Sequence, residues 1–171
     1  TMTSTMMNTP LGVKTLHRFG ARHFSTSRVG DYDGEQIHWR SYADIDASSA
    51  RLAQALTRLG IVPGDRVGTF MWNSTQHLEA YLAVPSLGAV LHTLNCRLSK
   101  EHIAYIINHA ADRFLILDAR LIDSFLPVLP LIPDVEHVIV SGGGDEAAGS
   151  LNDPRALSYE SLLRDAEPAF P

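Results

Sequence analysis

Lysine and cysteine are both scarce in this sequence of 171 residues. Only Lys14 and Lys100 are lysines among the 14 basic residues, which leaves few positions for a motif that activates a nucleotide with a lysine. The single cysteine, Cys96, excludes an intramolecular disulfide and a zinc site made of cysteines alone. One thiol is compatible with a reducing compartment, although it does not establish one.

A basic excess and long apolar runs are absent as well. The formal net charge is −5 and the pI is about 5.8, so no global basic field attracts nucleic acid or an anionic membrane. No apolar run reaches the roughly 20 residues that a transmembrane helix needs. The start has no basic flank followed by an apolar segment, so we expect no secretory signal there. Because Thr1 is not methionine, we expect the chain to begin after a processed or tag-derived segment.

The sequence does contain enough apolar residues for a core. It is 45% hydrophobic and 19% charged, which is ordinary for a globular protein. Its length corresponds to about one domain, and a chain of this size buries about two-thirds of its unfolded surface. Composition alone therefore predicts one folded domain of unexceptional type.

Short apolar runs alternate with stretches of helical periodicity through residues 36–141. Ser41 and Asp44 form a capping-box pattern, and Gly60 is placed to end the helix that follows. Strands are predicted at 36–39, 66–72, 89–94, 113–117 and 135–140, and helices at 42–59, 75–87, 100–110 and 121–129. The alternation predicts an α/β fold around a mainly parallel sheet, with the strand at 89–94 buried.

The remaining segments carry weaker patterns. We expect residues 1–35 to be loosely structured or to form a short helix, and 36–141 to be the α/β subdomain. Residues 142–157 read as a flexible glycine-rich loop, and 158–171 as a short helix and a linker.

Two groups of residues, a glycine run and a pair of histidines, are candidates for a phosphate or metal site. The run Gly142–Gly144 lacks the lysine of a phosphate loop and is followed by Asp145 and Glu146, so a surface loop is favoured. His102 and His109 are seven residues apart on one helix, roughly 10 Å, which is too far to share an ion. No metal site is therefore predicted.

A cysteine, two serines and several aromatic residues are candidates for nucleophilic or stacking roles. Cys96 with His92 as base would need a positioned pair and an oxyanion donor, so a partly buried thiol is the simpler interpretation. Ser86 and Ser141 lack the nucleophile-elbow motif. The aromatic residues that fall in core-like patterns are expected to pack in the core; they are Trp72, Tyr81 and Tyr105. From the residues alone, the chain has no complete catalytic constellation.

Several fragments, in order, resemble the N-terminal part of AMP-forming acid–CoA ligases, in the adenylate-forming superfamily. The segments that carry the resemblance are Ser41-Tyr42-Ala43-Asp44, Pro63-Gly64-Asp65-Arg66-Val67, Trp72-Asn73-Ser74, His77-Leu78-Glu79-Ala80-Tyr81, Leu91-His92-Thr93-Leu94-Asn95 and Arg97-Leu98. The pieces at 72–95, and Met6-Met7-Asn8-Thr9-Pro10-Leu11, look most like the fatty acyl-CoA ligase subgroup. The resemblance implies the N-terminal subdomain of such an enzyme.

The resemblance also implies a reaction that this chain does not complete. The family joins a fatty acid to CoA through an acyl-adenylate, using ATP and Mg²⁺ and releasing AMP and diphosphate. Its phosphate loop, adenine motif and catalytic lysine should lie beyond Pro171, so we expect the 171-residue chain alone to be inactive and no catalytic residue to lie in it. ATP, Mg²⁺ and CoA are expected of the parent only, with none binding this chain strongly.

One residue matches a ligand contact of the family. Arg97 corresponds to the arginine that family structures place near the CoA nucleotide, and a guanidinium suits a phosphate through its paired donors. A surface ion pair is the alternative role, and Cys96 stands where the family commonly has proline.

The expected partners are fatty acid, CoA and the remainder of the ligase, without nucleic acid. The parent is expected in the cytoplasm, with its lipid substrate offering a route to membranes. A truncated sheet exposes apolar surface, so a homo-oligomer is allowed. The alternative function is a free-standing α/β interaction module that keeps the ligase fold without catalysis.

Overall fold

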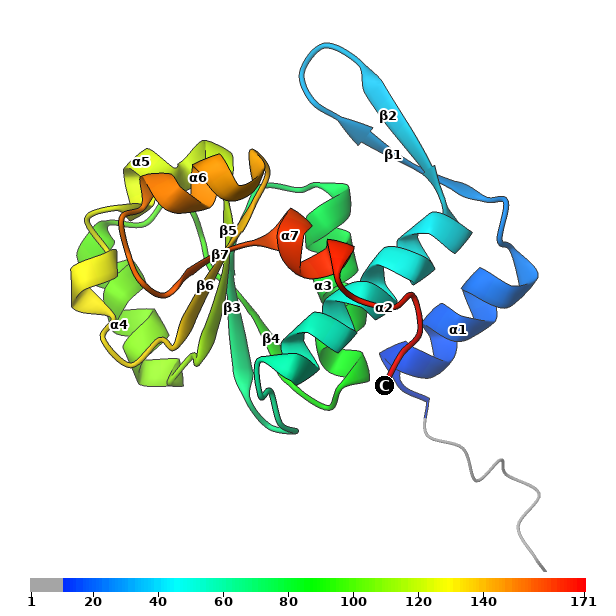
Figure 1. Ribbon diagram of the computed structural model, residues 1–171, viewed down its shortest axis with the longest axis horizontal. Coiled ribbons are helices and arrows are strands. Elements are labelled where there is room, and N and C mark those ends of the chain that lie inside the picture. Colours follow the sequence, from blue (N-terminus) through cyan, green and yellow to red (C-terminus); the bar gives the residue numbers. More distant parts are fainter. Residues whose placement is uncertain (1–10) are drawn as a thin grey trace, which may run out of the picture.

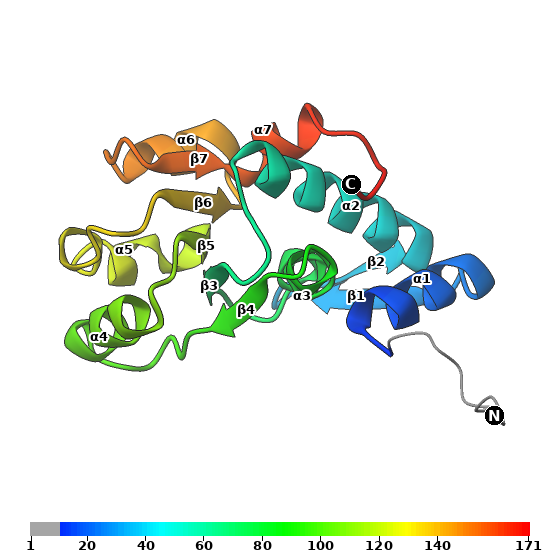
Figure 2. The same cartoon turned by 90° about the horizontal axis from the view of Figure 1, so that it is seen from below.

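The computed structural model describes residues 11–171, and the resemblance carried by residues 6–10 lies outside the described part. Five parallel strands form a sheet with helices on both faces, and a two-stranded hairpin and one helix lie to one side (Figures 1 and 2). The predicted α/β fold with a mainly parallel sheet is confirmed. None of the helices in residues 11–171 has the length and apolarity to cross a bilayer.

The N-terminal half begins with the lateral elements and then enters the sheet. In chain order these elements are α1 (Val13–His23), β1 (Arg28–Tyr32), β2 (Ile37–Ser41), α2 (Tyr42–Arg58), β3 (Arg66–Phe70), α3 (Thr75–Ser86) and β4 (Val90–Thr93). Strands β1 and β2 pair with each other, antiparallel. The expected boundary between residues 35 and 36 therefore falls inside the turn of a hairpin.

The second half completes the sheet. Its elements are α4 (Lys100–Ala110), β5 (Phe114–Asp118), the 3-10 turn η1 (Ala119–Leu121), α5 (Ile122–Phe125), η2 (Leu129–Leu131), β6 (His137–Ser141), α6 (Gly144–Ser150), β7 (Ala156–Ser158) and α7 (Tyr159–Arg164). The strand order is β4-β3-β5-β6-β7. The segment 121–129, expected to be helical but broken by Pro127 and Pro130, forms the short elements η1, α5 and η2, because proline cannot donate a backbone hydrogen bond.

Two predictions about strands and loops are wrong. The segment 142–157 is not a continuous flexible loop, since it contains α6 and β7. Strand β4 is not fully buried, because it lies at the edge of the sheet and Val90 is 50% exposed. A periodicity argument cannot place a strand at the edge or the centre of a sheet, since pairing depends on residues distant in sequence.

The core consists of two layers, one on each face of the sheet. Alternate residues of β5 divide between them, with Leu115 and Leu117 in one layer and Phe114 and Ile116 in the other. The first layer is covered by α4, α5 and α6, and the second by α2, α3 and α7. Strand β5 is buried at every position because β3 and β6 flank it and helices cover both faces.

Local signals explain the ends of the helices. At the start of α2, the Ser41 hydroxyl accepts from the Asp44 amide at 3.1 Å, and the Asp44 carboxylate accepts from the Ser41 amide at 3.1 Å. The predicted capping box is thus confirmed. Ser74, Ser99 and Ser158 cap α3, α4 and α7 in the simpler way, through the side chain alone.

Candidate functional site

The strand order creates a crevice at the carboxyl ends of the strands. From β3 the chain crosses to β4 on one side, and from β4 it returns to β5 on the other side of β3. Ligands of open α/β sheets bind where connections diverge in this way. The loops that follow the strands, at 71–74, 94–99 and 119–121, and the turn at 142–143 surround this edge.

Arg97 lies in a cleft between the first two of these loops. The cleft has a volume of about 300 Å³ and is lined by Met71–Asn73 and Leu94–Arg97. The Arg97 amide donates to the Asn95 side-chain oxygen at 3.0 Å, which holds the turn that presents the arginine. Arg97 is exposed, and no carboxylate of residues 11–171 lies within ion-pair distance of its guanidinium. The surface ion pair considered as its alternative role is therefore not formed in the described chain.

An aromatic side chain lies in the same cleft, contrary to the sequence prediction. Trp72 is 40% exposed rather than part of the core. Tyr81 and Tyr105 are 47% and 64% exposed, so the predicted core packing is wrong for all three residues. The Tyr105 ring stacks on His109, with 5.5 Å between ring centroids. The strand pattern at Trp72 and the helical pattern at Tyr81 and Tyr105 placed these rings near the core, but neither pattern decided which side chains face solvent.

Cys96 and His92 do not form a nucleophile–base pair. The Cys96 Sγ contacts the carbonyl oxygens of Met71 and Leu94 at 3.7 and 3.8 Å. Burial raises the pKa of the thiol, and the nearby charge of Asp118 adds to this effect. The imidazole of His92 instead pairs with the buried Asp112, whose Oδ2 is 2.8 Å from Nδ1. A neutral, partly buried thiol fits the simpler interpretation of Cys96.

A second cleft, next to the first, is acidic. It has a volume of about 280 Å³, and its lining includes Asp31, Asp33, Asp118 and Arg120. The guanidinium of Arg120 is bound to Asp118 by two hydrogen bonds of 3.0 and 2.7 Å, and these raise the pKa of Arg120. Since the only arginine of this cleft is neutralised and carboxylates surround it, the cleft is a poor site for phosphate.

The glycine run does not fit a nucleotide phosphate. Gly142, Gly143 and Gly144 all have positive φ, of 91°, 79° and 61°, which only glycine adopts readily. The amide of Gly142 already donates to a carboxylate oxygen of Glu160 at 2.8 Å. Asp145 follows in the first turn of α6. These residues do not suit the phosphates of ATP, because the Gly142 amide is already engaged and the neighbouring carboxylates repel an anion.

Metal-binding side chains are not brought together within residues 11–171. Among them, no three histidine, cysteine or acidic side chains lie close enough to hold one ion. His102 Nδ1 lies 3.3 Å from the Ser99 hydroxyl at the start of α4, while His109 stacks on Tyr105. Their roles in the described structure are local.

A buried carboxylate, not identified from the sequence as important, anchors the hairpin beside the site. Glu79 of α3 is 1% exposed and contacts both the Arg40 guanidinium of β2 and the Tyr159 hydroxyl of α7. Burial raises the pKa of Glu79, and the hydrogen bond from Tyr159 and the charge of Arg40 partly oppose that change. Arg40 also donates to the Ser48 hydroxyl of α2 at 2.7 Å. One carboxylate thereby connects four elements.

The hairpin also contacts the loop that lines the Arg97 cleft. Asp31 of β1 accepts hydrogen bonds from the Thr75 amide and hydroxyl, at 2.9 and 3.1 Å. Thr75 begins α3, directly after Trp72–Ser74. For Glu79, the sequence signal was a single acidic residue within the helix predicted at 75–87.

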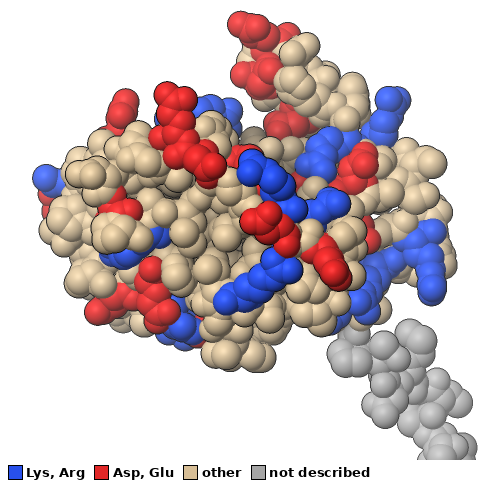
Figure 3. Space-filling view, in the orientation of Figure 1, with Lys and Arg blue, Asp and Glu red and all other residues tan. Residues whose placement is uncertain are grey.

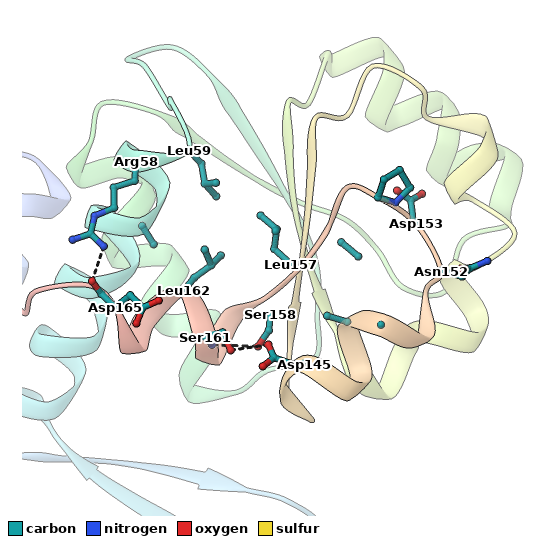
Figure 4. A pocket seen from close by; sticks show the side chains of 15 residues that line it. Arg58, Leu59, Asp145, Asn152, Asp153, Leu157, Ser158, Ser161, Leu162 and Asp165 are labelled. Atoms are coloured by element: carbon teal, nitrogen blue, oxygen red, sulfur yellow. Dashed lines mark hydrogen bonds between the residues drawn. The ribbon is translucent and has the colours of Figure 1, made fainter.

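A wider groove lies at the open edge of the sheet, away from this site. It has a volume of about 810 Å³ and runs beside β7, which pairs with β6 on its other side. Figure 4 shows that Arg58 points at Asp165 and Ser161 at Asp145; these hydrogen bonds are 2.6 and 2.7 Å long. The only cation lining the groove, Arg58, is thus engaged, and Asp145, Asp153 and Asp165 make the groove unsuited to an anion.

The fold and the crevice define an α/β ligand-binding domain of doubly wound type. The family described as AMP-binding enzyme matches residues 19–169, and the chain belongs to this family. In three dimensions, the chain superposes with a TM-score of 0.80 and 18% identity on the anthranilate CoA ligase AuaEII in complex with anthranoyl-AMP. That match covers 95% of this chain and 30% of the solved one, and at this identity it shows the fold alone.

Curated relatives share more sequence. The chain is 38% identical to the 3-methylmercaptopropionyl-CoA ligase of Ruegeria lacuscaerulensis, over 99% of this chain and 31% of the relative. It is 39% identical to the long-chain-fatty-acid–CoA ligase of Thermus thermophilus, over 96% of this chain and 30% of the relative. The medium-chain-fatty-acid–CoA ligase of Ectopseudomonas oleovorans is 34% identical, over 95% and 30%. The chain spans about 30% of the length of these relatives, and the resemblance seen in the sequence is confirmed.

Proposed function

We propose that this chain is the N-terminal part of an AMP-forming fatty acyl-CoA ligase. The family and the names of the medium- and long-chain relatives support this assignment. The parent reaction joins a fatty acid to CoA through an acyl-adenylate, with ATP as the source of AMP and diphosphate. Other relatives act on 3-methylmercaptopropionate and hydroxybenzoates by their names, so the acid class is the finer part of the proposal.

The role assigned to this chain is to bind part of CoA. The observation that carries it is the free guanidinium of Arg97, in a cleft beside the Trp72 ring at the carboxyl end of the sheet. A phosphate of the CoA nucleotide would accept paired hydrogen bonds from Arg97. Asp31 and Glu79 act as positioning residues, because they hold the hairpin against the helix that begins after Trp72–Ser74.

Arg97→Ala tests the CoA contact. A charge-assisted hydrogen bond contributes about 1.5–3 kcal/mol, so we expect CoA affinity to fall by roughly tenfold or more. Titration calorimetry, or NMR where binding is weak, measures this in the 171-residue chain and in its longer parent. Lys100→Ala is the matched control, since it removes an exposed cation three residues away. Equal affinities of wild type and Arg97→Ala, or absence of binding in both proteins, contradict this role.

Nucleotide activation is assigned to the remainder of the ligase. Two observations support this assignment: the Gly142 amide already donates to Glu160, and the cleft beside it is lined by carboxylates. We therefore expect the 171-residue chain to show no fatty-acid-dependent exchange between ATP and diphosphate. Radiolabelled diphosphate measures this exchange, with the longer parent as positive control. Exchange by the purified chain alone would refute the assignment.

A free-standing interaction module is the second candidate function. Strand β7 pairs with β6 on one side, and its other edge is open within residues 11–171. This open edge, beside the 810 Å³ groove, favours an interaction module because the edge of a strand can pair with a partner. The coding sequence after Pro171 separates the two functions. A ligase requires a continuation into a Ser/Thr/Gly-rich loop that ends in Pro-Lys-Gly, whereas a stop codon at this point favours the module.

A further inference from the structure

Helix α1 packs against α2 and α3 at the margin of the described fold. None of its residues is buried, and it lies at the outer margin of the molecule (Figures 1 and 2). Its inner face is marked by His17, Gly20 and Ala21, which line a cavity of about 230 Å³ over α2 and α3. His17 Nε2 is 2.7 Å from Asp46 Oδ1 of α2. On another side of α1, the Arg18 guanidinium lies over the Phe170 ring, 5.8 Å from its centroid, and the remaining surface of the helix is open to solvent.

Apolar side chains lie along one outer face of α1. Val13, Leu16 and Phe19 follow at intervals of three residues and are 43%, 59% and 56% exposed. Leu11 and Phe24, just outside the two ends of the helix, are 79% and 54% exposed. Leu16 reaches the rim of the inner cavity, but more than half of its surface remains open. The Phe19 ring contacts the neighbouring rings of His23 and Phe24, at 4.3 and 6.2 Å between centroids, yet the row as a whole stays largely exposed.

A row of basic side chains follows the neighbouring face. Lys14, Arg18 and Arg22 recur at intervals of four residues, and Arg28 begins the hairpin. The sequence before Asp31 contains these four cations and no acidic residue, while all 19 acidic residues lie at or after that position. None of the four cations forms an ion pair with a carboxylate of residues 11–171. Figure 3 shows Lys and Arg gathered at the end of the molecule where α1 lies.

We propose that this outer face of α1 binds an anionic lipid surface. A basic helix with an exposed apolar row lies in the headgroup region of a bilayer, where the cations meet lipid phosphates and the apolar groups reach the acyl boundary. The face lies at the outer margin of the fold, where a bilayer can approach it (Figures 1 and 2). The acidic residues of the sheet domain act weakly at this distance, because salt screens charges beyond about 8–10 Å.

The proposal does not depend on the ligase chemistry. It revises the inference from net charge, because a global charge of −5 conceals a segment with charge of the opposite sign. Three other partners could occupy the same face: an acidic protein, a second copy of this chain, or the remainder of the ligase. The experiment below distinguishes each of them from a lipid surface.

Vesicle sedimentation tests the lipid assignment with the purified chain. We expect binding to vesicles of phosphatidylcholine with about one-third phosphatidylglycerol, weak binding to pure phosphatidylcholine, and release in 0.5 M NaCl. Each basic residue near such a surface contributes about fivefold in partitioning, so Arg18→Glu with Arg22→Glu should lower binding by at least 25-fold. Leu11→Ser with Phe19→Ser should lower it as well, with the charge unchanged.

Matched variants and the longer parent make the test decisive. Lys100→Glu with Arg164→Glu makes the same change of charge at exposed positions on other helices and should bind like wild type. Circular dichroism confirms that each variant is folded. Three results would each overturn the proposal: the chain does not bind anionic vesicles, the α1 and control variants lose binding equally, or the chain binds while the longer parent does not. So would a dimer, found by analytical ultracentrifugation, that the α1 variants dissociate.

Discussion

At the scale of single residues, Glu79 shows how a charge can be buried and still be satisfied. Its carboxylate has a cation, Arg40, on one side and a hydroxyl, Tyr159, on the other. Desolvation nevertheless exceeds these contacts, so the pKa of Glu79 is raised above its ordinary value of 4.5. Tyr159 is buried beside the same carboxylate, and its own pKa is raised well above 10.0.

Glu79→Gln should reveal this balance in the pH dependence of stability. A raised carboxyl pKa means that the folded state binds the proton more tightly than the unfolded state does, so this group's contribution is greatest below pH 4.5. The stability of wild type relative to Glu79→Gln should therefore decrease as the pH rises through the folded-state pKa. Urea unfolding at a series of pH values measures the difference.

An exposed glutamate gives the control for that prediction. The pKa of Glu101, at the start of α4, is lowered by hydrogen bonds to its own backbone amide and to Ser99. Glu101→Gln should therefore show the opposite sign, with a contribution that is lost as the pH falls. If both variants had the same slope, burial would not be the cause at Glu79.

At the scale of elements, α2 has the most complete local signals in the chain. It begins in a reciprocal capping box, ends before Gly60 at φ 85°, and buries its apolar face against the sheet. Helix α1 is the opposite case, since Gly12 provides no side-chain cap and no residue of α1 is buried. The two helices therefore depend on different forces, packing with capping in α2 and marginal contacts in α1.

Ser41→Ala should remove the half of the α2 cap in which the Ser41 hydroxyl is the acceptor, whereas the Ser41 amide can still donate to the Asp44 carboxylate. We expect a loss of about 1 kcal/mol in the free energy of unfolding, because the Asp44 amide loses its acceptor. Gly20→Ala in α1 is a contrasting change, since its Cβ would meet nothing closer than 3.9 Å and alanine favours a helix. Gly20→Ala should be neutral or stabilising by up to about 1 kcal/mol. Denaturant unfolding measures the stability of both variants. A Ser41→Ala midpoint equal to that of wild type would contradict the capping role.

At the scale of the whole molecule, one sheet joins two apolar layers. Leu115 and Ile116 are adjacent in β5 and fully buried, but they face opposite layers. Because the strands between the layers are shared, neither layer can open while the other keeps its strands in place.

Leu115→Ala and Ile116→Ala should therefore both destabilise the entire domain. We expect roughly 2–5 kcal/mol for each, with one cooperative transition in both variants. Leu131→Ala, at a side chain that is 42% exposed, serves as the control and should change the free energy of unfolding by much less. Two separated transitions, followed by near-ultraviolet circular dichroism and by the combined fluorescence of Trp39 and Trp72, would show that the layers unfold independently.

The helices and strands that depend on neighbouring residues could be predicted from the amino-acid sequence alone. Capping residues, helical periodicity and short apolar runs located α2, α3, α4, β3, β5 and β6, and ordered fragments at 41–98 identified the family. The sequence also identified Arg97 as a candidate contact for CoA. These signals are readable because each depends on residues a few positions apart.

Strand positions and side-chain burial that depend on residues distant in sequence required the folded structure. It placed β4 at the sheet edge, turned 142–157 into a helix and a strand, and exposed Trp72 beside Arg97. It also buried Glu79 between a hairpin and a helix that is 80 positions away in the chain. Strand pairing and burial are properties of the assembled chain, whereas the exposed row on α1 became visible because nothing in residues 11–171 covers it.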